Sequence, residues 1–336
     1  MKKNLILGMF AATLLSTSCT NEDLATSQSE NDVQVSFKLG LEGGIATRAI
    51  SDGTGADRLV YAVFDENGNR ISTIAAVDKT TSFPTTESIT LAKGQTYKMA
   101  FWAQDSDCDA YTVNTNDMTV AVNYAADVNN DETRDAFFKT VEFTVTSSTS
   151  INVELKRPFA QINVGVYQDD WDAAVASGIE IEKSSVVIKN AATSLNLLTG
   201  AVGEETTDVE VSYGSEAIPA EAFTVDVNKD GDFEDENEKY VWLSMSYILV
   251  ADHDATADQN GLLGTDRTTL QELQYTFTPK SGNPIVFSEG LTSVPVQRNW
   301  RTNILGKILT GDIQFNISID PTYDGDIFFP ETQTEG

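Results

Sequence analysis

The sequence predicts an all-β protein built from two tandem β-sandwich domains, and three observations point to this class. Short apolar stretches with residue-by-residue alternation recur along the chain, separated by segments rich in Gly, Asn and Asp. No long segment shows the 3.6-residue spacing of an amphipathic helix, which disfavours a parallel sheet with crossover helices. The chain has 336 residues, which is too long for a single sandwich, and 40% of them are hydrophobic, which is enough to form folded cores.

The clearest strand lies near the N-terminus. Between residues 33 and 41, apolar side chains alternate with polar or small ones, which is the pattern of a half-buried strand. Its apolar positions are Val33, Val35, Phe37, Leu39 and Leu41.

Later segments continue the strand pattern. We expect strands at residues 59–65, 70–77, 88–91, 97–104, 119–122, 141–155, 160–167, 179–189, 221–227, 240–251, 273–278 and 311–319, with a hairpin turn at 66–69. Residues 171–177 are the best candidate for a short helix. Pro158 interrupts a strand, and a new apolar run follows it. We therefore place the N-terminal domain at residues 49–157 and the C-terminal domain at 158–336.

Residues 1–18 are predicted to be a lipoprotein signal peptide. Lys2 and Lys3 precede an apolar run at residues 5–15, which is shorter than the roughly 20 residues that span a bilayer. Small residues then lead to Cys19, an arrangement that resembles a lipobox, although Leu15 stands one position earlier than the usual leucine. Acylation of Cys19 would anchor the chain to the outer membrane. An ordinary secretory signal with a chance cysteine is the alternative.

Residues 19–48 are predicted to form a lipidated tether followed by the first strand. The stretch from Thr20 to Asp32 is polar and has little to bury. The chain has two cysteines, so if Cys19 is acylated then Cys108 has no disulfide partner. The formal net charge of −29 argues against nucleic acid as a partner, because binding phosphates requires clustered Lys and Arg.

Three segments occur in a recognisable order along the chain: TRA at residues 47–49, RPFAQINV at 157–164 and RNWRTNILG at 298–306. Together they resemble the corresponding segments of the fimbrillin-like proteins of Bacteroidetes, the subunits of type V pili. The resemblance implies two β-sandwich domains of transthyretin-like topology. It also implies a structural or accessory subunit of a surface fimbria with a role in adhesion.

The resemblance further implies a maturation route. In the family an arginine-specific protease cuts after the matching arginine, which here is Arg48, and Ala49 becomes the new N-terminus. The first strand is thereby removed, and the strand of another pilus subunit fills the groove that it leaves. A plain loop arginine is the alternative reading of Arg48. The family's donor strand is C-terminal, and the matching alternation consists of Ile313, Phe315, Ile317 and Ile319, which are otherwise an internal strand of the second domain.

The acidic segment that begins at Asp226 has the spacing of a calcium loop. Its oxygen-bearing residues alternate and Gly231 stands at the sixth position, but Asn237 replaces the usual twelfth-position glutamate. A solvated acidic hairpin is an equal alternative, and residues 127–131 repeat the pattern more weakly. No other cofactor is expected. The candidate Ca²⁺ ligands are Asp226, Asn228, Asp230 and Asp232.

Catalysis has little support in the sequence. His253 is the one histidine, and no nucleophile elbow accompanies it, so we expect no enzyme activity. The alternative to a pilus subunit is a monomeric surface lipoprotein that binds a glycan or host ligand, with or without calcium. A hydrolase with an acidic site ranks third. The four tryptophans, which are expected in cores rather than in a sugar platform, are Trp102, Trp171, Trp242 and Trp300.

Overall fold

The structure is a computed structural model. It describes residues 31–42, 55–124, 128–189, 191–203, 210–224, 238–250, 269–311 and 313–320. In these residues the regular secondary structure is mostly β-strand, with a single α-helix, α1 (Gln168–Ala176), and a 3₁₀ turn at Glu132–Arg134. The predicted all-β sandwich class is confirmed. Within the same residues, no helix is long and apolar enough to cross a membrane.

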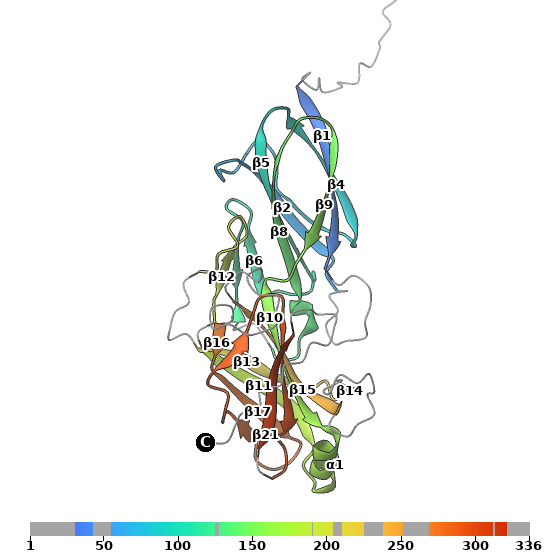
Figure 1. The fold of residues 1–336 in the computed structure, drawn as a ribbon, viewed down its shortest axis with the longest axis vertical. Coiled ribbons are helices and arrows are strands. Elements are labelled where there is room, and N and C mark those ends of the chain that lie inside the picture. The colour runs from blue at the N-terminus through green and yellow to red at the C-terminus, as the bar shows by residue number, and fades with distance from the viewer. Residues whose placement is uncertain are drawn as a thin grey trace, which may run out of the picture.

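The N-terminal part of the chain forms two facing sheets, drawn at the top of Figure 1. One has the order β4-β1-β9, made of Thr85–Ala92, Asp32–Leu41 and Thr149–Leu155. The other has the order β3-β2-β5-β8, made of Val77–Thr80, Arg58–Asp65, Thr96–Gln104 and Ala136–Thr144.

The C-terminal part of the chain forms a second pair of larger sheets. The first has the order β14-β15-β10-β20-β21, made of Ala222–Thr224, Lys239–Leu249, Phe159–Tyr167, Arg301–Lys307 and Gln314–Asp320. The second has the order β13-β11-β17-β18, made of Glu210–Ala217, Ile181–Lys189, Leu273–Pro279 and Ile285–Phe287. A two-stranded sheet pairs β16 (Thr269–Gln271) with β19 (Val294–Val296).

A small sheet ties the two parts together. Strands β6 (Tyr111–Asn114) and β7 (Thr119–Val122) belong to the N-terminal part, yet β7 also pairs with β12 (Ser194–Asn196). Sheet membership does change between β9 and β10, next to the boundary expected at residue 157. Independence of the two domains stays a prediction, because β12 crosses that boundary.

The first strands of the two parts have equivalent places. Strand β1 lies antiparallel to β4 and parallel to β9, and β10 lies antiparallel to β15 and parallel to β20. Parallel pairing of this kind joins strands that are far apart in sequence. In the described residues the N-terminal sheet ends at β9, whereas the C-terminal sheet continues beyond β20 to β21.

Three local predictions meet different outcomes. The short helix is confirmed, although it begins three residues earlier than expected, at Gln168. The return strand at 70–77 is wrong, because the Arg70 guanidinium donates hydrogen bonds to the carbonyl oxygens of Val63 (3.1 Å) and Ile74 (2.7 Å) and curls the segment around itself. The single strand at 141–155 is also wrong, because residues 145–148 turn the chain from β8 in one sheet to β9 in the other.

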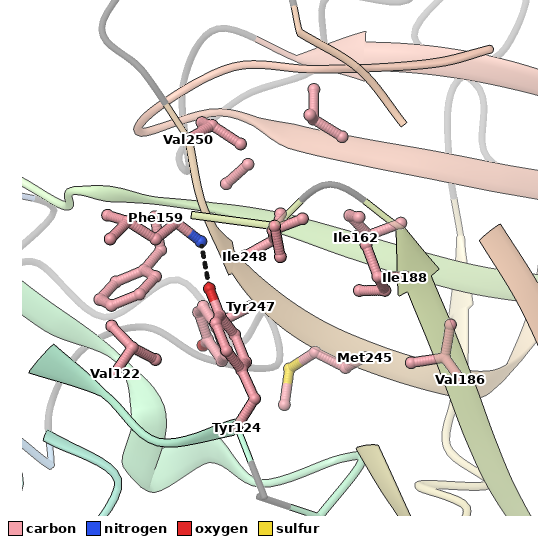
Figure 2. Close-up of a cluster of buried hydrophobic side chains, with 14 of the residues drawn as sticks. Val122, Tyr124, Phe159, Ile162, Val186, Ile188, Met245, Tyr247, Ile248 and Val250 are labelled. Atoms are coloured by element: carbon pink, nitrogen blue, oxygen red, sulfur yellow. Dashed lines mark hydrogen bonds between the residues drawn. The ribbon is translucent and has the colours of Figure 1, made fainter. Parts of the chain in front are cut away.

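Two large apolar cores stabilise these sheets. One lies inside the N-terminal sandwich and is built on β1. The larger one runs through the C-terminal sandwich and across the junction, where the rings of Tyr111 and Phe159 stack at 5.1 Å. Figure 2 shows part of it, with Val122 and Tyr124 of the N-terminal part beside Phe159 and Tyr247. The hydrogen bond drawn at Tyr124 is the one that its hydroxyl oxygen accepts from the Leu249 N–H at 3.1 Å.

Candidate functional site

The predicted removable strand, β1, is the central strand of its sheet. Its residues pair with β4 from Asp32 opposite Ala92 to Leu39 opposite Thr85, and with β9 from Val35 beside Thr149 to Leu41 beside Leu155. Both of its edges are therefore hydrogen-bonded along most of its length. The predicted half-buried strand is confirmed, and it has a neighbour on either side.

The apolar side chains of β1 fill the N-terminal core. Val35, Phe37 and Leu39 are at most 1% exposed, and Val33 and Leu41 are partly buried at the two ends. The Phe37 ring lies 5.5 Å from the Phe101 ring and 5.2 Å from the Phe143 ring, centroid to centroid. Burying a side chain of this type contributes about 1.5–3 kcal/mol, so β1 is a major part of this core.

The residue after β1 reaches the junction between the two parts. The Glu42 N–H donates to the Leu155 carbonyl at 2.9 Å, its Oε1 lies 2.9 Å from the Lys156 Nζ, and its Oε2 accepts from the Asn299 Nδ2 at 2.6 Å. The hydrogen bond to Glu42 raises the pKa of Lys156. We call these contacts of Glu42 with Lys156 and Asn299 the carboxylate clasp. Two of the three sequence segments singled out above meet here: Lys156 directly precedes RPFAQINV at 157–164, and Asn299 belongs to RNWRTNILG at 298–306.

Asn299 is held rigidly for this contact. Its φ is 62°, in the left-handed region that asparagine tolerates better than most residues. Its backbone N–H donates to the Phe159 carbonyl at 2.8 Å, which fixes it against the first residue of β10. The clasp therefore joins the end of β1 to the start of the second part through a preset backbone.

A buried ion pair lies beside the clasp. The Arg157 guanidinium donates to both Asp135 carboxylate oxygens, from Nε at 2.8 and 2.9 Å and from Nη2 at 2.8 Å. The two side chains are 1% and 6% exposed. Arg157 also lies over the Phe137 ring, 4.6 Å from its centroid. Bidentate pairing of this kind is strong and directional, so it fixes the last strands of the first part relative to β10.

A second junction contact involves the weaker calcium candidate at residues 127–131. The Asn129 Nδ2 donates to the hydroxyls of Ser184 (2.7 Å) and Ser244 (2.8 Å). The Asn130 side chain accepts from the Met245 N–H at 2.8 Å and donates to the Ala217 carbonyl at 2.8 Å. These two asparagines thus hold β11, β13 and β15 together, and Asp127 lies outside the described residues.

In the part of the chain that the structure describes, the candidate donor strand β21 lies at the edge of the C-terminal sheet. It pairs antiparallel with β20, from Arg301 opposite Asp320 to Lys307 opposite Gln314. The Phe315 ring meets the Phe287 ring edge-on at 5.0 Å and covers Gly290, where a Cβ atom would clash with it. At Gly306, a Cβ atom would clash with the Gln314 carbonyl oxygen and with the Phe315 Cα and Cβ atoms. Ile313 and Ile317 are partly buried against the same core, and Ile319 lies opposite Thr302 in the backbone register.

Several predicted site residues lie outside the described residues. They include the lipidation site Cys19, the cleavage site Arg48–Ala49, the calcium loop and the lone His253. Lipidation, cleavage and calcium binding at these positions remain predictions. Within the described part of the chain, no group of three or more His, Cys, Asp or Glu side chains is arranged to hold a metal ion.

Two of the four tryptophans lie in or against the larger core, as expected, and a third belongs to an outer cluster. Trp300 is partly exposed and belongs to none of the apolar clusters of the described residues. Trp102 is fully buried, and Trp171 packs against the larger core. Trp242 instead stacks on Phe223 with 3.6 Å between ring centroids, and Phe223 stacks on Tyr240 at 5.2 Å. This aromatic cluster forms a small core of its own, apart from the main one.

Comparison with known proteins places the chain in a family. The model of a family of unknown function, DUF6562, matches residues 26–335. The chain belongs to this family. No curated protein matches it.

Solved structures resemble the chain at low identity. The tip fimbrial protein Mfa3 from Porphyromonas gingivalis, in a C-terminally truncated form, is 14% identical over 86% of this chain and 99% of that one, with a TM-score of 0.44. A candidate polysaccharide-binding protein from Bacteroides thetaiotaomicron is 13% identical over 86% and 96%, with a TM-score of 0.47. A candidate cell adhesion protein from Bacteroides ovatus is 12% identical over 87% and 98%, with a TM-score of 0.47.

Proposed function

We propose that this family member is a structural or accessory subunit of a surface fimbria and acts in adhesion. It is exported as a lipoprotein acylated at Cys19, cut after Arg48 by an arginine-specific protease, and assembled with other pilus subunits by β-strand donation. The outer membrane holds it before the cut. No catalysis, cofactor or nucleic-acid partner belongs to this function, and Ca²⁺ at residues 226–232 is an optional addition.

The central, two-sided pairing of β1 carries the proposal. Loss of an edge strand would leave one new edge, whereas loss of β1 exposes the facing edges of β4 and β9 together with the core surface around Phe101. Unpaired N–H and C=O groups on two facing edges form a template for one incoming strand. The core surface that β1 had covered favours binding of this strand, because the bound strand removes the exposed apolar side chains from water again.

The place of β1 in the chain makes its removal simple. It is the first strand in the described residues, and residues 42–57, which include Arg48, separate it from β2 in the sequence. One cut there separates β1 covalently from everything that follows it, while hydrogen bonds and packing still retain it. The acyl anchor and the polar tether leave with the same fragment. A protected precursor and an assembly-competent subunit thus differ by one peptide bond.

The test is to treat the purified precursor with an arginine-specific protease and to record N-terminal sequence and size distribution together. A new terminus at Ala49 with ladders or filaments supports the proposal. Cleavage at Arg48 that leaves monomers contradicts self-polymerisation, and resistance at Arg48 contradicts the maturation step. The matched control is Arg48→Lys, which keeps the charge and should resist the enzyme.

The aromatic cluster favours the second candidate function, a monomeric surface protein that binds a glycan or host ligand. Trp242, Phe223 and Tyr167 are partly exposed on a face that the main core does not use. Aromatic rings of this kind supply large contact area at low entropic cost. Saturable quenching of tryptophan fluorescence by a glycan, abolished in Trp242→Ala, would support it. An unchanged spectrum across a glycan panel would exclude glycan binding there.

A further inference from the structure

We propose that the protein binds one ring of an uncharged glycan in a polar pocket formed by β11, β17 and the loop at residues 288–292. This inference rests on the proposed role in adhesion and deepens it, since it names the class of ligand and the residues that contact it. Strands β11 and β17 belong to the sheet β13-β11-β17-β18, whereas Trp242 belongs to β15 in the other sheet. The pocket is therefore separate from the aromatic cluster.

The pocket has a volume of about 280 Å³ and two walls. One wall is formed by adjacent strands, which lie side by side in Figure 1: Val187 of β11 is directly opposite Gln274 of β17, and the Lys189 N–H donates to the Glu272 carbonyl at 3.0 Å. Pockets for drug-sized ligands begin at about 300 Å³, so this one suits a single sugar ring. The side chains that carry the argument are those of Val187, Lys189, Glu272, Gln274, Ser288 and Thr292.

The strand wall carries both hydrogen-bond donors and acceptors. The Lys189 Nζ donates to the Glu272 Oε1 at 2.7 Å, and each side chain is 46% exposed, so a ligand can reach both. Gln274 is exposed, and its amide can donate and accept. One positive and one negative side chain leave this wall without net charge. It therefore matches hydroxyl groups, which also donate and accept, better than a carboxylate or a phosphate.

Val187 adds an apolar surface to the same pocket. It is partly buried, and its place opposite Gln274 puts the two side chains next to each other across the strands. A pyranose ring has an apolar face of C–H groups and a rim of hydroxyls. Such a ring can cover Val187 while its hydroxyls reach Gln274 and Glu272. The formal net charge of the chain, −29, further disfavours acidic sugars.

The loop wall is held in place by its own backbone. Leu291 is fully buried, its N–H donates to the Ser288 carbonyl at 3.1 Å, and its carbonyl accepts from the N–H of the first residue of β17 at 2.9 Å. Gly290 has a φ of 78°, and a Cβ atom there would lie 2.6 Å from the Phe315 Cζ. Ser288 and Thr292 thus stand on a preset loop, which lowers the entropic cost of binding.

A second ion pair on the same two strands provides a matched control. The Lys280 Nζ lies 2.6 Å from the Glu180 Oε2, with side chains 61% and 51% exposed. The Lys280 N–H donates to the Glu180 carbonyl at 2.8 Å, as the Lys189 N–H does to that of Glu272. This pair lies at the opposite end of β11 and β17, and neither of its residues lines the pocket. The two pairs therefore differ in the presence of the pocket and little else.

Saturation-transfer NMR on the uncut full chain tests the site, with the methyl glycosides of glucose, galactose, mannose and N-acetylglucosamine as probes. At least one should bind with a dissociation constant on the order of 1 mM, because a half-open pocket makes few hydrogen bonds. Glu272→Gln and Gln274→Ala should each weaken binding about tenfold, the usual loss for one hydrogen bond. Glu180→Gln should leave binding unchanged, and matching unfolding midpoints should show that all three variants are folded.

Three results would overturn the inference. Absence of binding by all four probes would refute the class of ligand. Equal affinities of the wild type, Glu272→Gln and Gln274→Ala would refute the site. Tighter binding of the methyl glycoside of glucuronic acid than of that of glucose would refute the preference for uncharged sugars. None of these bears on cleavage at Arg48, whereas a cleaved chain that binds sugar but does not assemble would refute strand donation and leave the pocket intact.

Discussion

The Asn299 side chain donates a 2.6 Å hydrogen bond to the Glu42 carboxylate, although 257 positions separate the two residues in the chain. Glu42 also contacts Lys156, so the end of the first strand touches the last residues of the first part and the approach to β20. The strand proposed for removal therefore stabilises its own sheet and, through one side chain, the junction with the second part.

Glu42→Gln should lower the free energy of unfolding of the uncut chain by about 1 kcal/mol, because the pair with Lys156 is lost and the bond to Asn299 becomes neutral. The effect is modest because the Glu42 and Lys156 side chains are 27% and 50% exposed. Urea denaturation measures it. The control is Glu180→Gln, which breaks an exposed pair with Lys280 and should change stability by less than about 0.5 kcal/mol. Equal effects would deny Glu42 a special role.

Phe37→Ala should lower the free energy of unfolding of the precursor by about 3–5 kcal/mol, because a fully buried ring is replaced by a cavity between Phe101 and Phe143. The control on the same strand is Lys38→Ala, an exposed position that should stay within about 0.5 kcal/mol of wild type. After cleavage, the Phe37→Ala strand should also dissociate faster, as followed by size-exclusion chromatography. A small loss at Phe37 would show that β1 is held by its backbone alone.

Alternation was enough to predict both strands of the candidate site. Strand β1 buries one face and exposes the other, so its pattern has period two, and β21 has the same pattern because it is an edge strand over a core. The prediction failed at 70–77, which was expected as the return strand of a hairpin and does not alternate strictly, because Arg70 satisfies the local carbonyl groups. Residue composition does not distinguish a strand paired in a sheet from a loop whose carbonyl groups accept hydrogen bonds from one arginine side chain.

The junction could not be predicted from the sequence. Glu42, Asp135 and Asn299 are ordinary polar residues until the fold brings them to Lys156 and Arg157. Asn129 and Asn130 resembled part of a calcium loop because oxygen-bearing side chains can either bind a metal ion or hydrogen-bond neighbouring strands. In the structure their side chains hydrogen-bond to β11 and β15, which the sequence does not reveal. Their one sequence-visible hint is that asparagine tolerates a positive φ, which Asn130 adopts.

Asp135→Asn should lower the free energy of unfolding by about 3 kcal/mol, because it leaves the buried Arg157 guanidinium without its carboxylate partner. Replacing both residues, as Arg157→Met with Asp135→Leu, should be less harmful than Asp135→Asn, since no uncompensated charge stays buried. Calorimetric or urea unfolding of the three proteins measures the difference. If the double variant has a much lower free energy of unfolding than Asp135→Asn, the ion pair itself, and not the burial of its side chains, stabilises the junction.

Asn130→Ala should destabilise more than Asn130→Gly, although both remove the same amide. The Asn130 φ is 64°, which glycine adopts freely and alanine adopts at a cost of about 1 kcal/mol. Both variants lose the bonds to the Met245 N–H and the Ala217 carbonyl, so each should fall about 1–3 kcal/mol below wild type. Identical stabilities for the two variants would show that the backbone conformation contributes nothing at this position.

Tyr124 should make the protein sensitive to alkali. Burial raises the pKa of Tyr124 to about 12, and its hydroxyl donates to the Ala192 carbonyl at 2.9 Å. In the unfolded chain a tyrosine pKa lies near about 10, so the unfolded state loses its proton first as the pH rises. The contribution of Tyr124 to stability is therefore complete below about pH 10 and decreases, by about 2 kcal/mol in all, as the pH rises to about 12.

Tyr124→Phe isolates this contribution. The variant should be less stable than wild type near neutral pH, because the Leu249 N–H and the Ala192 carbonyl lose their partner. Its stability should also fall less steeply between about pH 10 and pH 12, since one buried phenol no longer titrates. Urea denaturation at a series of pH values measures both effects. Burial also raises the pKa of Tyr275, so Tyr275→Phe is the matched control for a phenol distant from the junction. Parallel pH profiles for wild type and Tyr124→Phe would show that the pKa of Tyr124 is the same in the folded and unfolded states, and would contradict the buried contact between Tyr124 and β15.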